Sequence, residues 1–377
     1  MRIPGQVIEW LLEKDNPPVR YLTLTNLLHK STAAREVREA RSHLMEYEVT
    51  REILRRGDEF WSADEDRAYW KYTGKYWQII FLGQFLADGG DPRIAEGVNG
   101  ILEKRGWVTR GGAQCLTANI LAALMRLGYG DHRVVMEETE ALAKRINHDR
   151  GIVCTAMDYS LLPRCHMAQP KILLCFAQIP PGRSSPAVAA AIELLVNELI
   201  DNQIFIYVPG HQKEWQEILK HTPKKEDLPR GQTVKAWIQA ERGRLLRTRG
   251  LGQRQPKQGW LRFGFPLHYN SDILEAMHAL AVLNIPMDQR LEKPLEAIQA
   301  KMTSEGTWIL ENSLNGKMLV DVEKKGEASK WLTYFGHFVL AHFAGPQKRA
   351  RDSVRKMSGK RLDSAEQDAA RDWADRC

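Results

Sequence analysis

The sequence predicts an all-α protein, a single closed barrel of helical hairpins in which inner and outer helices alternate. Three observations predict it: a weak internal repeat, an alternation of all-round apolar helices with one-faced helices, and a near absence of strand patterns. The one β-like run covers residues 204–208. Because a helix that is apolar on every side is buried on every side, the apolar helices are expected around the barrel axis.

The internal repeat consists of an Asp-x-Arg signature, an amphipathic stretch and a glycine turn. The signature occurs at residues 91–93, 131–133 and 288–290. The turns that close the three stretches contain Gly106, Gly151 and Gly306. An apolar helix opens after each turn, so the loops before the inner helices are expected to face one common mouth. The predicted inner-helix starts lie near Tyr21, Tyr72, Cys115, Cys165, Tyr269 and Lys330.

Composition and charge indicate one large globular domain, residues 1–345. The chain has 377 residues, of which 43% are apolar, with 54 basic and 47 acidic side chains. The basic excess is confined to residues 213–257, so nucleic acid is not an expected partner. We expect this segment to be an insertion packed over one end of the barrel, either as a solvated loop or as a lid that binds diphosphate. Residues 346–377 are expected to form a loosely ordered charged tail.

The sequence has the features of a cytoplasmic protein. Its first residues run directly into a helical pattern without the apolar core of a signal peptide. No apolar run approaches the ~18–20 residues that span a bilayer, so integral membrane association is not expected. The five cysteines are scattered and odd in number, unlike a secreted disulfide framework. The sequence leaves the oligomeric state open.

Two segments carry a resemblance to a known superfamily. Residues 301–308, Lys-Met-Thr-Ser-Glu-Gly-Thr-Trp, are similar to the Gln-Trp repeat of the terpenoid cyclase and protein prenyltransferase superfamily, which includes squalene-hopene cyclase. Residues 329–333, Ser-Lys-Trp-Leu-Thr, open the next helix. Residues 15–24, 71–78 and 264–266 resemble uncharacterised bacterial members. The resemblance covers residues 5–345 and implies an α/α toroid whose central hydrophobic cavity binds a small hydrophobic, isoprenoid-type ligand.

The departures from the superfamily leave the function open. The Asp-x-Asp-Asp acid of class II terpene cyclases is absent, so no catalytic residue carries over. The chain is therefore either a transferase-like or cyclase-like enzyme without that acid, or a non-catalytic binding or scaffold module on the same fold. A third class, carbohydrate processing, would use paired carboxylates at the mouth, for which Asp272 and Asp158 are the candidates.

Three cysteines and a histidine predict a zinc site at the mouth. Cys115 and Cys165-His166 lie at the starts of successive inner helices, and Cys154 lies in the loop between them. Zinc takes Cys, His or carboxylate ligands in a tetrahedral shell. The resemblance to protein prenyltransferases also implies zinc, but their Asp-x-Cys motif is absent. The alternative, which is the more common situation, is three ordinary buried thiols.

Asp272 is the candidate catalytic acid or base, with His268 and Tyr269 beside it. A desolvated carboxyl group at the mouth could exchange protons with a ligand. The alternative, which we favour, is that Asp272 caps the following helix.

A set of aromatic residues near the inner-helix starts is the candidate ligand-binding surface. These side chains could line an apolar cavity and stabilise a cation by cation–π contact, or they could pack as core without a ligand. The set comprises Trp70, Tyr72, Trp77, Phe263, Phe265 and Trp331.

Overall fold

The computed structural model describes residues 3–61, 65–104, 113–153 and 164–344, and it confirms the all-α prediction. The structure is 60% helix and 4% strand. In the described ranges the strands form two short antiparallel pairs. These are β1 (Ile206–Tyr207) with β2 (Gln255–Pro256), and β3 (Trp308–Ile309) with β4 (Ala328–Ser329). No helix in these ranges is both long enough and apolar enough to cross a membrane.

Six largely buried helices make up the centre of the described structure. Their sequence is apolar almost all round, and each begins within four residues of a predicted start. Neighbours in the chain order pack on one another: α6 on α9, α9 on α11, α11 on α15, α15 on α17, and α17 on α2. The six are α2 (Pro17–Leu22), α6 (Lys75–Gln84), α9 (Gln114–Leu124), α11 (Ala168–Phe176), α15 (Ile273–Val282) and α17 (Lys330–Ala344).

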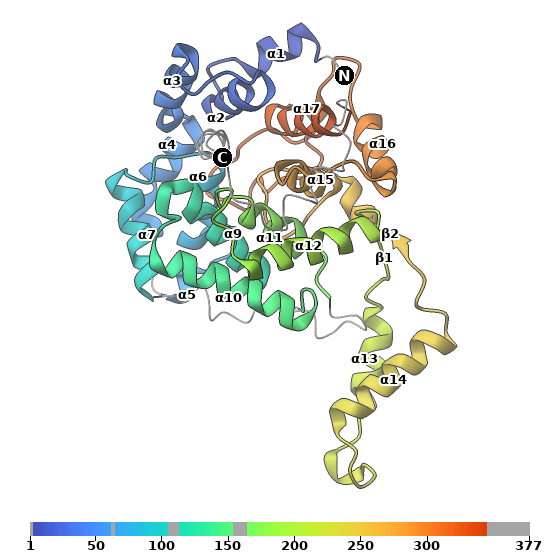
Figure 1. The fold of residues 1–377 in the computed structure, drawn as a ribbon. Coiled ribbons are helices and arrows are strands. Elements are labelled where there is room, and N and C mark those ends of the chain that lie inside the picture. The colour runs from blue at the N-terminus through green and yellow to red at the C-terminus, as the bar shows by residue number, and fades with distance from the viewer. Residues whose placement is uncertain (1–2, 62–64, 105–112, 154–163, 345–377) are drawn as a thin grey trace.

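The remaining helices of the body have one buried face, and many of them lie around the outside (Figure 1). In α10, for example, Val135, Leu142 and Ile146 are buried while the opposite face is charged. These helices are α1 (Gly5–Leu11), α3 (Arg35–Ser42), α4 (Glu48–Arg55), α5 (Glu65–Ala68), α7 (Pro92–Lys104), α10 (Arg133–Asp149), α12 (Pro186–Asp201) and α16 (Glu292–Ala300). The structure also has short helical turns: the π-helical η1 (Thr23–Leu27) and η4 (Met125–Tyr129), and the 3-10 turns η2 (Leu44–Glu46), η3 (Gly57–Glu59), η6 (Lys225–Asp227), η7 (Gln258–Leu261) and η8 (Gln289–Leu291).

The Asp-x-Arg signature initiates helical turns. Asp91 accepts a hydrogen bond from the backbone N–H of Arg93 at 3.0 Å and pairs with its guanidinium group. Asp288 does the same for Arg290, at 2.9 Å. Asp131, in the third copy, forms its ion pair elsewhere. Two of the three copies therefore share one structural role, which is to satisfy a free N–H at a helix start.

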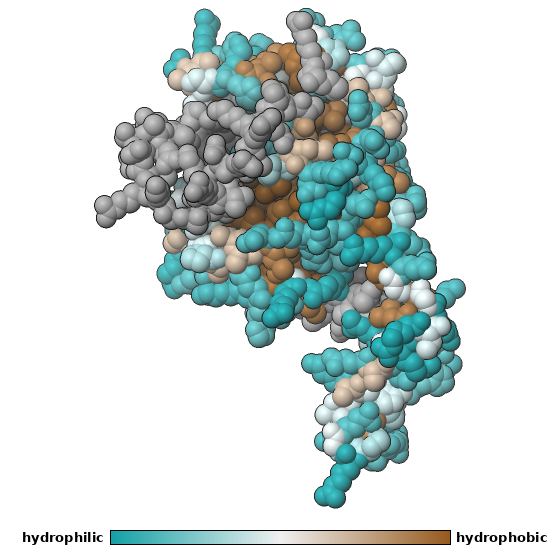
Figure 2. Space-filling view, turned by 45° about the vertical axis from the view of Figure 1, so that its right-hand side comes forward, coloured by the Kyte–Doolittle hydropathy of each residue, from teal (hydrophilic) through white to brown (hydrophobic). Residues whose placement is uncertain are grey.

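Residues 212–254 form a basic arm that projects from the helical body (Figure 1), and its surface is mostly hydrophilic (Figure 2). Its two helices, α13 (Gln212–Lys220) and α14 (Val234–Thr248), bury Ile218 and Leu245 between them. From the sequence we expect the insertion to pack over one end of the barrel. The structure shows instead that it projects from the helical body. The reason is that the arm has its own small apolar cluster, in which Ile218 and Leu245 are buried.

Candidate functional site

Loops that precede four inner helices meet at one end of the molecule, as the repeat predicts. Two adjoining hollows of about 430 and 420 Å³ lie there and share His268, Asn270 and Asn312. We call them together the mouth cleft. They are lined by residues 71–72 before α6, Met167 before α11, 257–272 before α15, and 312–317 before α17.

The floor of the mouth cleft is held by a buried ion pair. Lys171 of α11 and Glu275 of α15 have side chains that are 0% and 1% exposed, and Lys171 Nζ lies 2.8 Å from each carboxylate oxygen. The same Nζ donates to Ser271 Oγ at 2.8 Å and to the carbonyl oxygen of Asn270 at 3.3 Å. Because the three N–H groups of the ammonium are shared among these four internal acceptors, Lys171 positions the lining residues Asn270 and Ser271.

Asp272 lines the mouth cleft and also caps α15. Its Oδ1 accepts a hydrogen bond from the backbone N–H of Glu275 at 2.8 Å, and its Oδ2 accepts one from Gly264 at 2.9 Å. Burial, followed by the neighbouring Glu275, raises the pKa of Asp272 to about 7. The structure thus shows the capping role that we favour from the sequence.

His268 lies in both hollows as a neutral ring. Burial, and then the positive charges of Lys171, Lys71 and Lys317, lower its pKa to about 3. Its Nδ1 accepts a hydrogen bond from the backbone N–H of Asn270 at 3.3 Å. The ring proton therefore resides on Nε2, which is a neutral donor.

Tyr269, the third candidate, belongs to an aromatic cluster rather than to the lining of the cleft. Its hydroxyl lies 2.9 Å from that of Tyr69, and its ring meets Trp77 edge-on at 4.9 Å between centroids. Burial raises the pKa of Tyr269 above its ordinary value. A phenol that is already paired and is harder to ionise is a poor proton donor to a ligand.

Most of the aromatic residues proposed to line a cavity fill the interior, although Tyr72 also borders the mouth cleft. Phe265 stacks on Trp331 at 4.3 Å and 16°, and Tyr72 meets Trp77 at 4.8 Å. Trp70 is different, because 57% of its surface is exposed and it lies in the turn before α6. The buried members pack against one another in the described structure: Tyr72, Trp77, Phe263, Phe265 and Trp331.

The rim of the mouth cleft is strongly basic. The cationic side chains that line it are Lys71, Lys257, Arg262 and Lys317. Lys257 is half-buried, and burial lowers its pKa from its ordinary value. The N-cap residues of α11 and α15, Met167 and Asp272, line the cleft, so the positive dipole ends of these two helices add to this charge.

Three of the four predicted zinc ligands, Cys115, Cys165 and His166, belong to the described residues. His166 stacks on Tyr207 at 3.7 Å between centroids. Cys115 and Cys165 are buried thiols, and Cys154 lies outside the described residues. Among the residues that are described, no group of three or more His, Cys, Asp or Glu side chains could hold a metal ion. The zinc site therefore stays a prediction, with ordinary packing of the buried thiols as its alternative.

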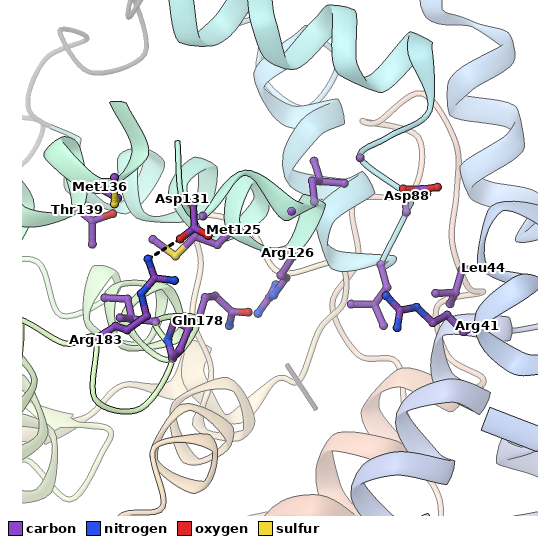
Figure 3. Close-up of a pocket in the computed structure, with 18 of the residues that line it drawn as sticks. Arg41, Leu44, Asp88, Met125, Arg126, Asp131, Met136, Thr139, Gln178 and Arg183 are labelled. Carbon is purple, nitrogen blue, oxygen red and sulfur yellow. Dashed lines mark ion pairs between the residues drawn. The ribbon is translucent and has the colours of Figure 1, made fainter. Parts of the chain in front are cut away.

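A larger cavity of about 950 Å³ lies at the other ends of the inner helices (Figure 3). We call it the end cavity. Its walls come from residues 41–45, from 86–89 after α6, from 125–131 at the end of α9, and from 178–185 after α11. Sequence patterns did not indicate this cavity, because glycine-containing segments such as 86–90 and 127–130 are typical of simple turns.

Comparisons of the chain with models of protein families, with curated proteins and with solved structures find no match. They assign no family, so the function is argued from the geometry of the two cavities.

The raised pKa of Asp272 predicts a pH-dependent stability. Between the ordinary Asp pKa of ~3.9 and about 7, the native state keeps a proton that the unfolded chain has released, so stability falls as pH rises. Asn at this position keeps a capping oxygen but does not titrate. We therefore expect the free energy of unfolding of Asp272→Asn, relative to the wild type, to rise between pH ~5 and pH ~8 by up to about 1.4 kcal/mol per pH unit. Urea unfolding of both proteins at the two pH values measures it, and parallel pH profiles would contradict the prediction.

Proposed function

We propose that the protein is an α/α toroid that binds a small molecule with an anionic head group in the mouth cleft. The succession of contacts between inner helices, from α6 through α9, α11, α15 and α17 to α2, supports the toroid. In such a ring all inner helices run in one direction, which explains why their preceding loops share one end.

The charge around the mouth cleft carries this proposal. Four basic side chains, Lys71, Lys257, Arg262 and Lys317, line it, whereas Asp272 is the one acidic side chain among the lining residues. With a pKa of about 7, that carboxyl group is partly protonated near neutral pH. Phosphate, diphosphate and carboxylate groups are favoured by such cations and by helix N-termini.

Neutral donors in the cleft complete the recognition of an anion. Asn270, Asn312 and Ser313 line the two hollows, and His268 presents a neutral ring. Ser271 also lines the cleft, but its hydroxyl group donates to the carbonyl oxygen of Met167. Amide and hydroxyl groups donate to phosphate oxygens without adding charge. The combined volumes fall in the range of ~300–1,000 Å³ that small-ligand sites occupy.

The cleft also has apolar side chains, which would contact the organic part of a ligand whose head group is anionic. Tyr72, Trp260, Leu267 and Leu314 are among the lining residues. An isoprenoid diphosphate combines both features, and it agrees with the resemblance noted from the sequence. Its chain would lie along the cleft, because the aromatic side chains between the inner helices fill the space that a central cavity would need.

The geometry favours binding over catalysis. Both oxygens of Asp272 accept backbone hydrogen bonds, and the Tyr269 hydroxyl pairs with that of Tyr69. An acid or base at either position would have to break one of these bonds before transferring a proton. The non-catalytic binding module is therefore the form of the function that we propose.

Titration calorimetry with inorganic diphosphate tests the proposal. We expect Lys71→Ala combined with Lys317→Ala to weaken binding by about tenfold or more, since charge-assisted hydrogen bonds to the anion are lost. Lys257→Ala combined with Arg262→Ala should act in the same direction. Lys293→Ala, an exposed lysine on α16, is the control and should leave the affinity unchanged. Absence of diphosphate binding, or equal binding by all three variants, would refute the anion site.

A further inference from the structure

We propose that the end cavity is a second binding site, for a small apolar molecule that carries an anionic group. The site goes beyond the proposed function, because it lies at the opposite ends of the inner helices from the mouth cleft. Its volume of about 950 Å³ suits a drug-sized ligand.

Arg126 supplies a cation in the middle of the end cavity. Figure 3 shows the ends of Arg126 and Gln178 pointing toward each other, with the Arg183–Asp131 ion pair to one side and Arg41 to the other. After burial, the charge of Arg126 contributes to the pKa shifts of Cys175 and His278, so these two buried groups lie within electrostatic range of the guanidinium group. A guanidinium group has five N–H donors, so an internal partner still leaves donors for a ligand anion.

The walls around Arg126 combine adaptable apolar side chains with several charged ones. Three methionines contribute to them, Met45, Met125 and Met136, and methionine adjusts its shape to the molecule that it contacts. Met136 is 45% exposed, which is unusual for an apolar side chain of that size. The other apolar lining residues include Leu44, Leu86, Leu127, Ile179 and Val188. The lining also includes Arg41, Arg183, Asp88, Asp131 and Glu140. Asp131 pairs with Arg183 and Glu140 pairs with Lys144, so Arg126 and Arg41 outnumber the remaining carboxylate, Asp88. A wall of this kind fits an amphipathic anion better than a purely polar one.

The backbone of the cavity wall has uncommon conformations. Leu86 has a φ of 57°, in the left-handed region that side chains other than glycine rarely adopt. Gly128 has a φ of 91° within the π-helical turn η4. A Cβ atom at Gly89 would come within 1.9 Å of the carbonyl oxygen of Leu127, so the two segments touch. Both π-helical turns and strained residues gather at functional sites, which agrees with a built cavity.

The two sites are separated by packed side chains. Phe85 at the end of α6 contacts Phe265 and Trp331, which stack on each other in the interior. A ligand head group in the mouth cleft therefore cannot reach Arg126 without displacing this aromatic core. Occupation of the end cavity should consequently be independent of inorganic diphosphate at the mouth.

Fluorescence titration with anilinonaphthalene sulfonate, a small aromatic sulfonate, tests the second site. We expect Met136→Asp and Arg126→Gln each to weaken binding by about tenfold or more, by adding a negative charge and by removing the positive one. Leu219→Asp is the matched control, because Leu219 is 44% exposed and lies on the basic arm. Phenylnaphthylamine, an uncharged relative of the probe, should bind the wild type more weakly and be insensitive to Arg126→Gln.

Two results would overturn the proposal. One is sulfonate binding that Met136→Asp leaves unchanged, a variant that alters a half-exposed position and therefore should still fold. The other is displacement of the sulfonate by inorganic diphosphate, which would place the probe in the mouth cleft. Diphosphate binding is measured in Met136→Asp and Arg126→Gln as well. If both variants bind diphosphate normally, a negative result with the sulfonate refutes the second site and leaves the proposed function of the mouth cleft standing.

Discussion

Replacing Lys171 by Met is expected to lower the free energy of unfolding by about 3–5 kcal/mol, because it leaves the Glu275 carboxylate buried without its counter-ion. Both side chains are at most 1% exposed, and their contacts at 2.8 Å leave no room for water between them. The variant also removes the donor from Ser271 and Asn270, so the floor of the mouth cleft should lose its fixed position. Urea unfolding followed by tryptophan fluorescence measures the change.

The double variant Lys171→Met, Glu275→Leu is the matched control. A buried ion pair replaced by apolar side chains of similar volume is often neutral for stability or improves it by about 1–4 kcal/mol. We therefore expect the double variant to recover most of the stability that the single variant loses. It should not recover diphosphate affinity, because the residues that line the cleft lose their anchor. A single variant within about 0.5 kcal/mol of the wild type would contradict the burial of this pair.

The helices and their order could be predicted from the sequence because their signals are local. Apolar segments such as residues 114–124, bounded by turn residues, place each inner helix within a few positions of where it lies. The cap formed by Asp272 is also local, since donor and acceptor are three residues apart. The grouping of the loops at one mouth follows from the repeat and needs no contact information.

The chemistry of the site could not be predicted, because its contacts are long-range. Lys171 and Glu275 are 104 residues apart in the chain. The available signal was that each is the lone charged residue within an otherwise apolar helix, which requires a buried partner. Nothing in the sequence indicates which partner that is. The direction of the basic arm likewise depends on the contact between Ile218 and Leu245, which the sequence does not indicate.

The aromatic residues show most clearly that the sequence pattern does not indicate which side chains are buried. Trp70 and Trp77 lie one after the other in a single pattern, yet Trp70 is 57% exposed and Trp77 is fully buried. Packing alone decides between a ligand-lining wall and a filled core. A substitution in the interior can therefore test which of the two this protein has.

Trp331→Ala is expected to lower the free energy of unfolding by about 3–5 kcal/mol through lost burial and a residual cavity. Trp331 is 1% exposed, stacks on Phe265 at 4.3 Å, and lies 6.1 Å from Phe85 between centroids. Thermal unfolding measures the loss. Trp70→Ala is the control, and its exposed position should change stability by no more than about 0.5 kcal/mol.

Added indole distinguishes a filled core from an open ligand cavity. A closed apolar cavity of the size of a tryptophan ring binds small aromatic molecules, so indole should raise the melting temperature of Trp331→Ala and leave the wild type unchanged. If the space around Trp331 were an open binding cavity, its loss would cost less than about 1 kcal/mol, because water or ligand already occupies the region. Indole would then stabilise the wild type as well. The packing of Phe265, Trp331 and Phe85 argues for the first outcome, and it agrees with our proposal that ligands bind at the two ends of the helices and not along their axis.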